Sequence, residues 1–115
     1  MSVDFVRRLC NSFPHATEHM QWEALVYKIG GKIFAIAALD PGSVWLSFKC
    51  SPEEFAELVE RTGIIPAPYL ARAYWVGLET DDAMNPAELK QRLRTAYDLI
   101  FAQFPRKKRE ELRQA

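Results

Sequence analysis

The chain has 115 residues, of which 49% are hydrophobic and 26% charged, and its formal net charge is zero. These values predict one globular domain over residues 1–115 and exclude a generally basic nucleic-acid binder, because such proteins neutralise many phosphates. No apolar run approaches the roughly 20 residues of a membrane span, so we expect no membrane contact. Cys10 and Cys50 have no zinc-ligand spacing, and we expect reduced thiols in a cytoplasmic protein.

The N-terminal segment is predicted to form an amphipathic helix. Its apolar residues recur at three- and four-residue spacing, Ser2 is a suitable cap, and Pro14 ends the pattern. Residues 15–24 show no regular pattern beyond a possible short strand at 20–22.

Gly30 and Gly31 lie between two runs of β-branched and aromatic residues, VYKI and KIFAI. A phosphate-binding glycine loop leads into a helix, and no helix start follows here, so the glycines predict a two-residue hairpin turn. The turn sets the pairing of the strands. It places two groups of residues on opposite sides of the sheet: Leu25, Tyr27, Ile29, Lys32, Phe34, Ile36 and Ala38 toward the helices, and Val26, Lys28, Ile33, Ala35, Ala37 and Leu39 away from them.

The second half alternates strands and helices. Ser51 to Glu54 carry a capping box with proline at the first helical position, and Asn85 to Glu88 repeat that order of cap, proline and glutamate. The sequence thus predicts an α+β fold with a single antiparallel sheet and helices mainly on one face. The predicted segments are a turn at 40–43, a strand at 44–50, a helix from 51 to Gly63, a connector at 64–73, a strand at 74–79, a helix from 85 to Pro105 and a polar C-terminal extension at 106–115.

His15, Glu18 and His19 match H-x-x-E-H, the pattern of an inverted zinc peptidase. That chemistry needs a helix that places both imidazoles beside the metal, and a third ligand farther along. Here the pattern follows Pro14 and runs into a predicted strand, so we interpret the histidines as surface residues. No nucleophile or acid–base group of an active site emerges elsewhere. We expect no enzyme activity, no cofactor and no metal.

Basic and aromatic residues gather near the predicted hairpins. In β-ribbon and winged DNA-binding proteins, cations contact phosphates and planar groups contact bases or sugars. The structural alternative is that edge lysines prevent strand pairing between molecules, that strand aromatics belong to the core, and that basic residues favour a helix end. The candidate nucleic-acid-binding residues are Lys28, Lys32, Lys49, Arg72, Tyr74, Trp75, Arg106, Lys107 and Lys108.

An ordered series of segments resembles the MmcQ/YjbR family of small bacterial proteins over nearly the whole chain. The residues that carry the resemblance are Phe13-Pro14, Thr17-Glu18, VYKIGGKIFA, LSFKCSPEE, GIIPAPY, Trp75, AYDLI and the end Pro105-Arg-Lys-Lys. The resemblance implies a frataxin-like (CyaY-like) α+β fold. It also implies binding to double-stranded DNA through a double wing, which would comprise the Gly30–Gly31 and Pro41–Gly42 hairpins.

One segment departs from the family pattern. Relatives carry a polar, basic stretch before the tryptophan, whereas this chain has Ala71 and Ala73 on either side of Arg72. If those polar residues form the family's working surface, that surface is weakened in this chain. The alternative function is that of a non-enzymatic module that binds an unknown protein or small ligand. Such a module would use Trp75 with Tyr69 and Tyr74. The sequence leaves the isomeric state of Pro66 and Pro68 open.

Overall fold

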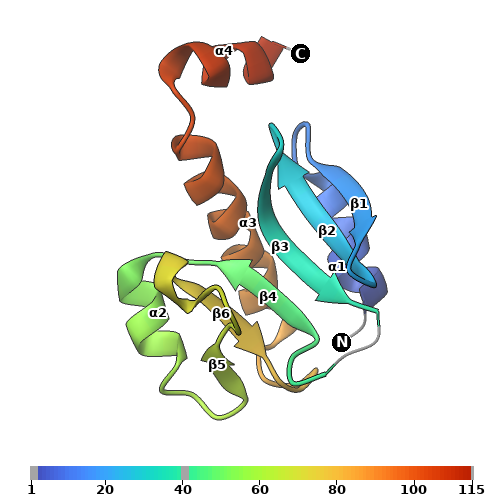
Figure 1. Ribbon diagram of the computed structural model, residues 1–115, viewed down its shortest axis with the longest axis vertical. Helices are drawn as coiled ribbons and strands as arrows, with labels where there is room; N and C mark the ends of the chain where they lie inside the picture. The colour runs from blue at the N-terminus through green and yellow to red at the C-terminus, as the bar shows by residue number, and fades with distance from the viewer. Residues whose placement is uncertain (1–2, 40–41, 115) are drawn as a thin grey trace.

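The computed structural model describes residues 3–39 and 42–114. Figure 1 shows one antiparallel sheet with α1 and α3 behind it. The predicted cap Ser2 and the turn residues Asp40 and Pro41 lie outside the described residues. The elements in chain order are α1 (Val3–Ser12), β1 (Thr17–Gln21), β2 (Ala24–Ile29), β3 (Lys32–Ala38), β4 (Leu46–Lys49), α2 (Pro52–Leu58), β5 (Ile64–Pro66), η1 (Ala71–Ala73), β6 (Trp75–Leu78), α3 (Pro86–Ala102) and α4 (Arg106–Gln114).

The sheet has six strands in the order β1-β2-β3-β4-β6-β5, and every neighbouring pair is antiparallel. The predicted α+β fold with one antiparallel sheet is therefore confirmed. Two parts of the prediction were wrong. Residues 17–21 form a complete edge strand instead of a short strand at 20–22, and the connector at 64–73 contains the other edge strand and a short 3-10 helix. The polar residues that continue beyond Pro105 form a separate helix, α4. Pro66 and Pro68 both follow trans peptide bonds.

The register of the central hairpin differs from the prediction because β3 contains a bulge. Ile29 pairs with Lys32 as expected, but Tyr27 pairs with Ala35, so Phe34 has no partner on β2. A bulge adds one residue to one strand and reverses the alternation beyond it. The expected pairs Tyr27–Phe34 and Leu25–Ile36 were therefore wrong. Ala35 and Ala37 belong to the core beneath the helices, whereas Ile36 and Ala38 are only half-buried.

Phe34 lies at the centre of the core. Its ring centroid is 6.0 Å from that of Phe13 at the end of α1, 6.5 Å from Tyr27 of β2, and 5.6 Å from Tyr97 of α3. These rings connect the first helix, the sheet and the long helix. The burial predicted for Phe34 is confirmed, because its side chain has no exposed area.

Both predicted helix caps are present. The Ser51 side chain accepts a hydrogen bond from the backbone N–H of Glu54, and the Glu54 carboxylate accepts one from the backbone N–H of Ser51. Asn85 caps α3 through the backbone N–H of Glu88. These caps satisfy backbone N–H groups that have no partner within a helix, so the starts of α2 and α3 follow from local sequence.

Candidate functional site

The tip of the β2–β3 hairpin packs against the junction of α3 and α4. A Cβ atom placed on Gly30 would lie 2.7 Å from the ring of Phe104 and 3.3 Å from Leu112 Cδ1. Beside this contact, the Lys32 ammonium lies 5.0 Å from the centroid of the Phe104 ring. The contact brings Lys32 next to α4, which follows it by more than 70 positions in the sequence. In Figure 1, α4 lies just beyond the tip of the hairpin.

This arrangement concentrates positive charge at one end of the molecule. We call the helix α4, together with Lys28 and Lys32, the basic end. It holds seven basic and two acidic side chains, a net charge of +5, so the other residues carry eight basic and thirteen acidic groups, −5. Lys32 is exposed and Lys28 is half-buried. Within the basic end, the guanidinium of Arg106 forms an ion pair with Glu110 at 3.1 Å. The side chains of Lys107 and Lys108 are exposed to solvent.

Lys49, Arg72 and Tyr74 form a second, smaller cluster. The Lys49 ammonium donates a hydrogen bond to the backbone carbonyl of Ala73 and lies 5.4 Å from the centroid of the Tyr74 ring. The Tyr74 ring also meets Phe55 edge to face, with centroids 5.7 Å apart. Lys49 and Tyr74 thus already have intramolecular partners, and Arg72 is exposed beside them.

Trp75 is only 6% exposed. It pairs with Lys49 across β6 and β4, and its neighbours Val76 and Leu78 belong to the core. Its ring therefore offers little surface to a base or a small ligand. Of the three aromatic residues expected to form an alternative binding surface, only Tyr69 and Tyr74 are exposed.

The two expected wings lie at opposite ends of the sheet. Gly30–Gly31 joins β2 to β3, whereas the segment that contains Gly42 joins the far end of β3 to β4. β3 has seven residues. At about 3.3 Å per residue, it separates the two turns by roughly 20 Å. Pro41 lies outside the described residues, and only the Gly30–Gly31 turn belongs to the basic end.

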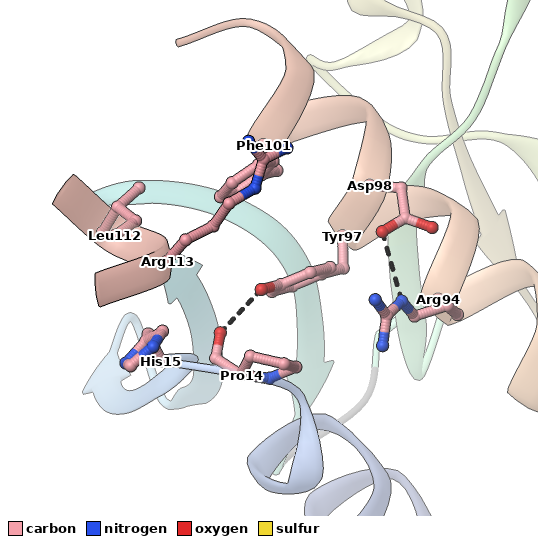
Figure 2. Close-up of a pocket in the computed structure, with 8 residues that line it drawn as sticks. All are labelled: Pro14, His15, Arg94, Tyr97, Asp98, Phe101, Leu112 and Arg113. Atoms are coloured by element: carbon pink, nitrogen blue, oxygen red, sulfur yellow. Dashed lines mark hydrogen bonds and ion pairs between the residues drawn. The ribbon is translucent and has the colours of Figure 1, made fainter. Parts of the chain in front are cut away.

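A cavity of about 320 Å³ lies between α3, α4 and the turn that follows α1 (Figure 2). The Tyr97 hydroxyl donates a 2.6 Å hydrogen bond to the backbone carbonyl of Pro14. This bond ties the turn to α3 at one wall of the cavity. Leu112 lines the cavity and also faces Gly30, so α4 borders both the cavity and the hairpin contact. The lining residues are Pro14, His15, Arg94, Tyr97, Asp98, Phe101, Leu112 and Arg113.

Sequence reasoning did not identify this cavity. Within α3, Tyr97 and Phe101 are four residues apart and therefore share a face. Nothing in the sequence shows, however, that α4 turns back toward this face after Pro105. The one sequence feature at this site that can be read locally is the four-residue spacing of Arg94 and Asp98. It predicts an ion pair across one turn of α3, which the structure shows at 3.1 Å.

Arg92 and the two cysteines stabilise the fold. Arg92 is 15% exposed and bridges Glu54 of α2, at 2.7 Å, to Glu88 within α3, at 3.0 Å. Burial raises the pKa of both thiols, Cys10 and Cys50, to about 12, so each behaves as a buried apolar group.

His15 and His19 lie in a turn and a strand instead of a helix, and over residues 3–39 and 42–114 no cluster of three metal-ligating side chains occurs. In the same ranges, no helix is long and apolar enough to cross a membrane.

A family model described as YjbR matches residues 11–99. The chain belongs to the YjbR family. No curated protein matches it. Two solved chains do, and one of them is the crystal structure of Deinococcus radiodurans protein DR2400, a DUF419 domain. It is 29% identical to this chain, with a TM-score of 0.86, and the match covers 96% of this chain and 87% of that one.

The YjbR match divides the basic end. The hairpin with Lys28 and Lys32 lies inside the matched residues, whereas α4 lies beyond them. The cavity is divided in the same way: His15, Arg94 and Tyr97 lie inside the match, and Arg113 lies outside it. Both sites thus combine the YjbR region with the C-terminal helix.

Proposed function

We propose that this YjbR protein binds the phosphate backbone of double-stranded DNA through its basic end, without catalysing a reaction. The observation that carries the proposal is the packing of Gly30 against Phe104 and Leu112, which joins Lys28 and Lys32 to the basic residues of α4. A net charge of +5 on this surface, with −5 on the other residues, gives the protein an oriented field that favours a polyanion at one end.

The chemistry of this end predicts weak binding without base selection. Lysine and arginine side chains contact phosphates, which carry no sequence information, and the only tryptophan proposed to stack on bases is buried. Engagement of three or four phosphates implies a log–log salt slope of roughly −3 to −4. Lys49 and Arg72 would contribute little, because Lys49 already has partners in Ala73 and Tyr74.

Titration of a labelled duplex at low salt, followed by fluorescence anisotropy, tests the proposal. We expect a dissociation constant of about 1–100 µM at physiological salt and tighter binding at low salt. The double variant Lys32→Glu with Lys108→Glu should weaken binding by at least about tenfold and reduce the salt slope by about two. Both side chains are exposed, so the variant should fold, and its thermal melting temperature should be close to that of the wild type.

The matched control is Arg8→Glu with Lys90→Glu. These exposed residues line a separate hollow between α1 and the first half of α3, and the substitutions change the net charge by the same amount. The control should therefore retain most of the binding. No binding at about 100 µM protein, or an equal loss in both double variants, would overturn the proposal. That result would favour the alternative, a protein- or ligand-binding surface around Tyr69 and Tyr74.

A further inference from the structure

The first strand of the sheet, β1, has an open edge. It pairs with β2 on one side, and in Figure 1 it lies at the border of the sheet. Gln21 and Ala24 form the pair that closes the two-residue turn at 22–23, so they exchange backbone hydrogen bonds. Because bonded and non-bonded pairs alternate along an antiparallel ladder, the backbone N–H and C=O groups of Glu18 and Met20 point away from β2. β1 thus presents donors and acceptors to a further strand.

The opposite edge of the sheet is protected against such pairing. β5 has three residues and contains Pro66. The N–H of Ala67 donates to the carbonyl of Trp75 at 3.0 Å, so by the same alternation Pro66 occupies a position whose N–H would point outward. Short length and proline are two ways in which proteins prevent an edge strand from pairing further. β1 has five residues and contains no proline, lysine or glycine, so it lacks both features.

Exposed apolar side chains lie along this open edge. Met20 is 70% exposed, and Trp22, in the turn that follows β1, is 74% exposed. Trp22 and Glu23 have φ angles of 55° and 57°, although the central residues of such a turn are usually asparagine, aspartate or glycine. A bulky residue adopts this left-handed conformation only at an energetic cost, and strain of this kind concentrates at functional sites. The chain thus maintains a strained, exposed tryptophan at the end of an open strand edge.

The sequence of β1 is complementary to itself in one antiparallel register. When His19 lies opposite the partner's His19, Glu18 lies opposite the partner's Met20, and the outward backbone groups of these residues meet. A slip of two residues in one direction would place Glu18 opposite the partner's Glu18, where like charges repel. A slip in the other direction would place Glu18 opposite the partner's Trp22, whose left-handed backbone does not continue a strand.

The charge of Glu18 does not oppose the first register. Its carboxylate accepts a hydrogen bond from the Tyr27 hydroxyl at 2.9 Å and forms an ion pair with Arg7 of α1 at 3.1 Å. Both contacts lie within one subunit, so the carboxylate is compensated before a second strand arrives. The side chain that faces it across the new pair, the partner's Met20, is uncharged.

We propose that two copies of this chain associate through their β1 strands and form one continuous antiparallel sheet. Each Glu18–Met20 pair exchanges two backbone hydrogen bonds, and the partner strand covers Met20 and Trp22. The contact uses the same surface on both subunits, so it closes at a dimer, and the protected β5 strands form the two edges of the joined sheet. A strand of five residues buries little area, which predicts weak association that depends on concentration.

Analytical ultracentrifugation at protein concentrations from about 10 µM to about 1 mM tests the proposal. The weight-average mass should rise from 13.2 kDa toward about twice that value. Hydrogen exchange followed by NMR locates the contact, because the amides of Glu18 and Met20 should be protected in the dimer and should exchange rapidly in the monomer. A mass that stays at 13.2 kDa up to about 1 mM would overturn the proposal, and so would a dimer in which both amides remain unprotected.

Met20→Pro removes one outward N–H and leaves the hydrogen bonds between β1 and β2 in place. The variant should therefore fold, while dimerisation weakens by about tenfold or more. The matched control Met20→Ala keeps this N–H and should dimerise more tightly than Met20→Pro. Equal association of Met20→Pro and the wild type would contradict pairing through β1.

Trp22→Asn separates the dimer contact from folding. Asparagine is favoured in this turn, so the melting temperature of the monomer should be unchanged or higher, whereas loss of the indole should weaken dimerisation by about fivefold or more. Undiminished dimerisation of this variant would show that Trp22 lies outside the contact and would overturn the proposed register. Lys32→Glu with Lys108→Glu should dimerise as the wild type does, because β1 contains no residue of the basic end. Failure of DNA binding and failure of dimerisation are thus measured separately.

Discussion

Gly30 lies so close to Phe104 that a Cβ atom on Gly30 would be 2.7 Å from the far end of the ring. This approach brings the hairpin tip against the C-terminal part of the chain, and a Cβ atom on Gly30 would require the Phe104 ring to move. Gly30 also has a φ angle of +59°, which glycine adopts without strain. Its neighbour Gly31 has a φ angle of +87° but has no atom within 4 Å of such a Cβ.

The two glycines therefore predict different responses to alanine. Gly31→Ala should cost about 1–2 kcal/mol, the strain of a left-handed residue. Gly30→Ala should cost more than Gly31→Ala, since it also displaces Phe104, and it should weaken DNA binding by moving α4 away from Lys32. Urea unfolding of both variants measures the difference. Equal losses of unfolding free energy would show that Gly30 does not hold the hairpin against Phe104.

The bulge in β3 predicts unequal contributions from Phe34 and Ile36. Phe34 has no exposed area and contacts three aromatic rings, so Phe34→Ala should cost about 3–5 kcal/mol. Ile36 is half-buried on the other side of the sheet, and Ile36→Ala should cost less than about 2 kcal/mol. Chemical denaturation of the two variants tests this order. Equal losses would contradict the observed register and favour the unbulged pairing.

The ion pairs between α2 and α3 predict a loss of stability in acid. The hydrogen bond from Arg61 lowers the pKa of Glu88 below its ordinary value of 4.5; partial burial opposes this effect, and a hydrogen bond from Arg92 reinforces it. A carboxyl group with a lowered folded-state pKa stabilises the fold above its unfolded-state pKa. That contribution is lost as the pH falls through the folded-state pKa.

Glu88→Gln removes this titration. Between about pH 6 and about pH 3, the unfolding free energy of the wild type should fall more steeply than that of Glu88→Gln. Glu60→Gln, which changes an exposed carboxylate outside the network, should retain the wild-type slope. Urea unfolding at a series of pH values supplies the comparison. Parallel curves for the wild type and Glu88→Gln would mean that Glu88 does not couple stability to pH.

Short-range sequence signals are sufficient to specify much of the local structure of this protein. The glycine pair, the capping residues at 51 and 85 and the hydrophobic periodicity specify a hairpin and helix starts, because turn geometry and capping depend on neighbouring residues. These signals were sufficient to predict an antiparallel α+β fold. The ordered motifs were also sufficient to identify the YjbR family, which the match to residues 11–99 confirms.

Tertiary structure alone decided which residues meet. The bulge in β3 was not apparent from the alternation of the sequence, and it reversed the expected positions of Ile36 and Ala35. The edge strand β5 contains Pro66, a residue of low strand propensity. This strand forms because it pairs with β6, and that long-range contact cannot be predicted from local propensity. Likewise, the direction of α4 after Pro105 follows from contacts of Leu112 and Arg113 with distant residues. Those long-range contacts assemble both the basic end and the cavity, because each site combines α4 with segments far from it in the chain.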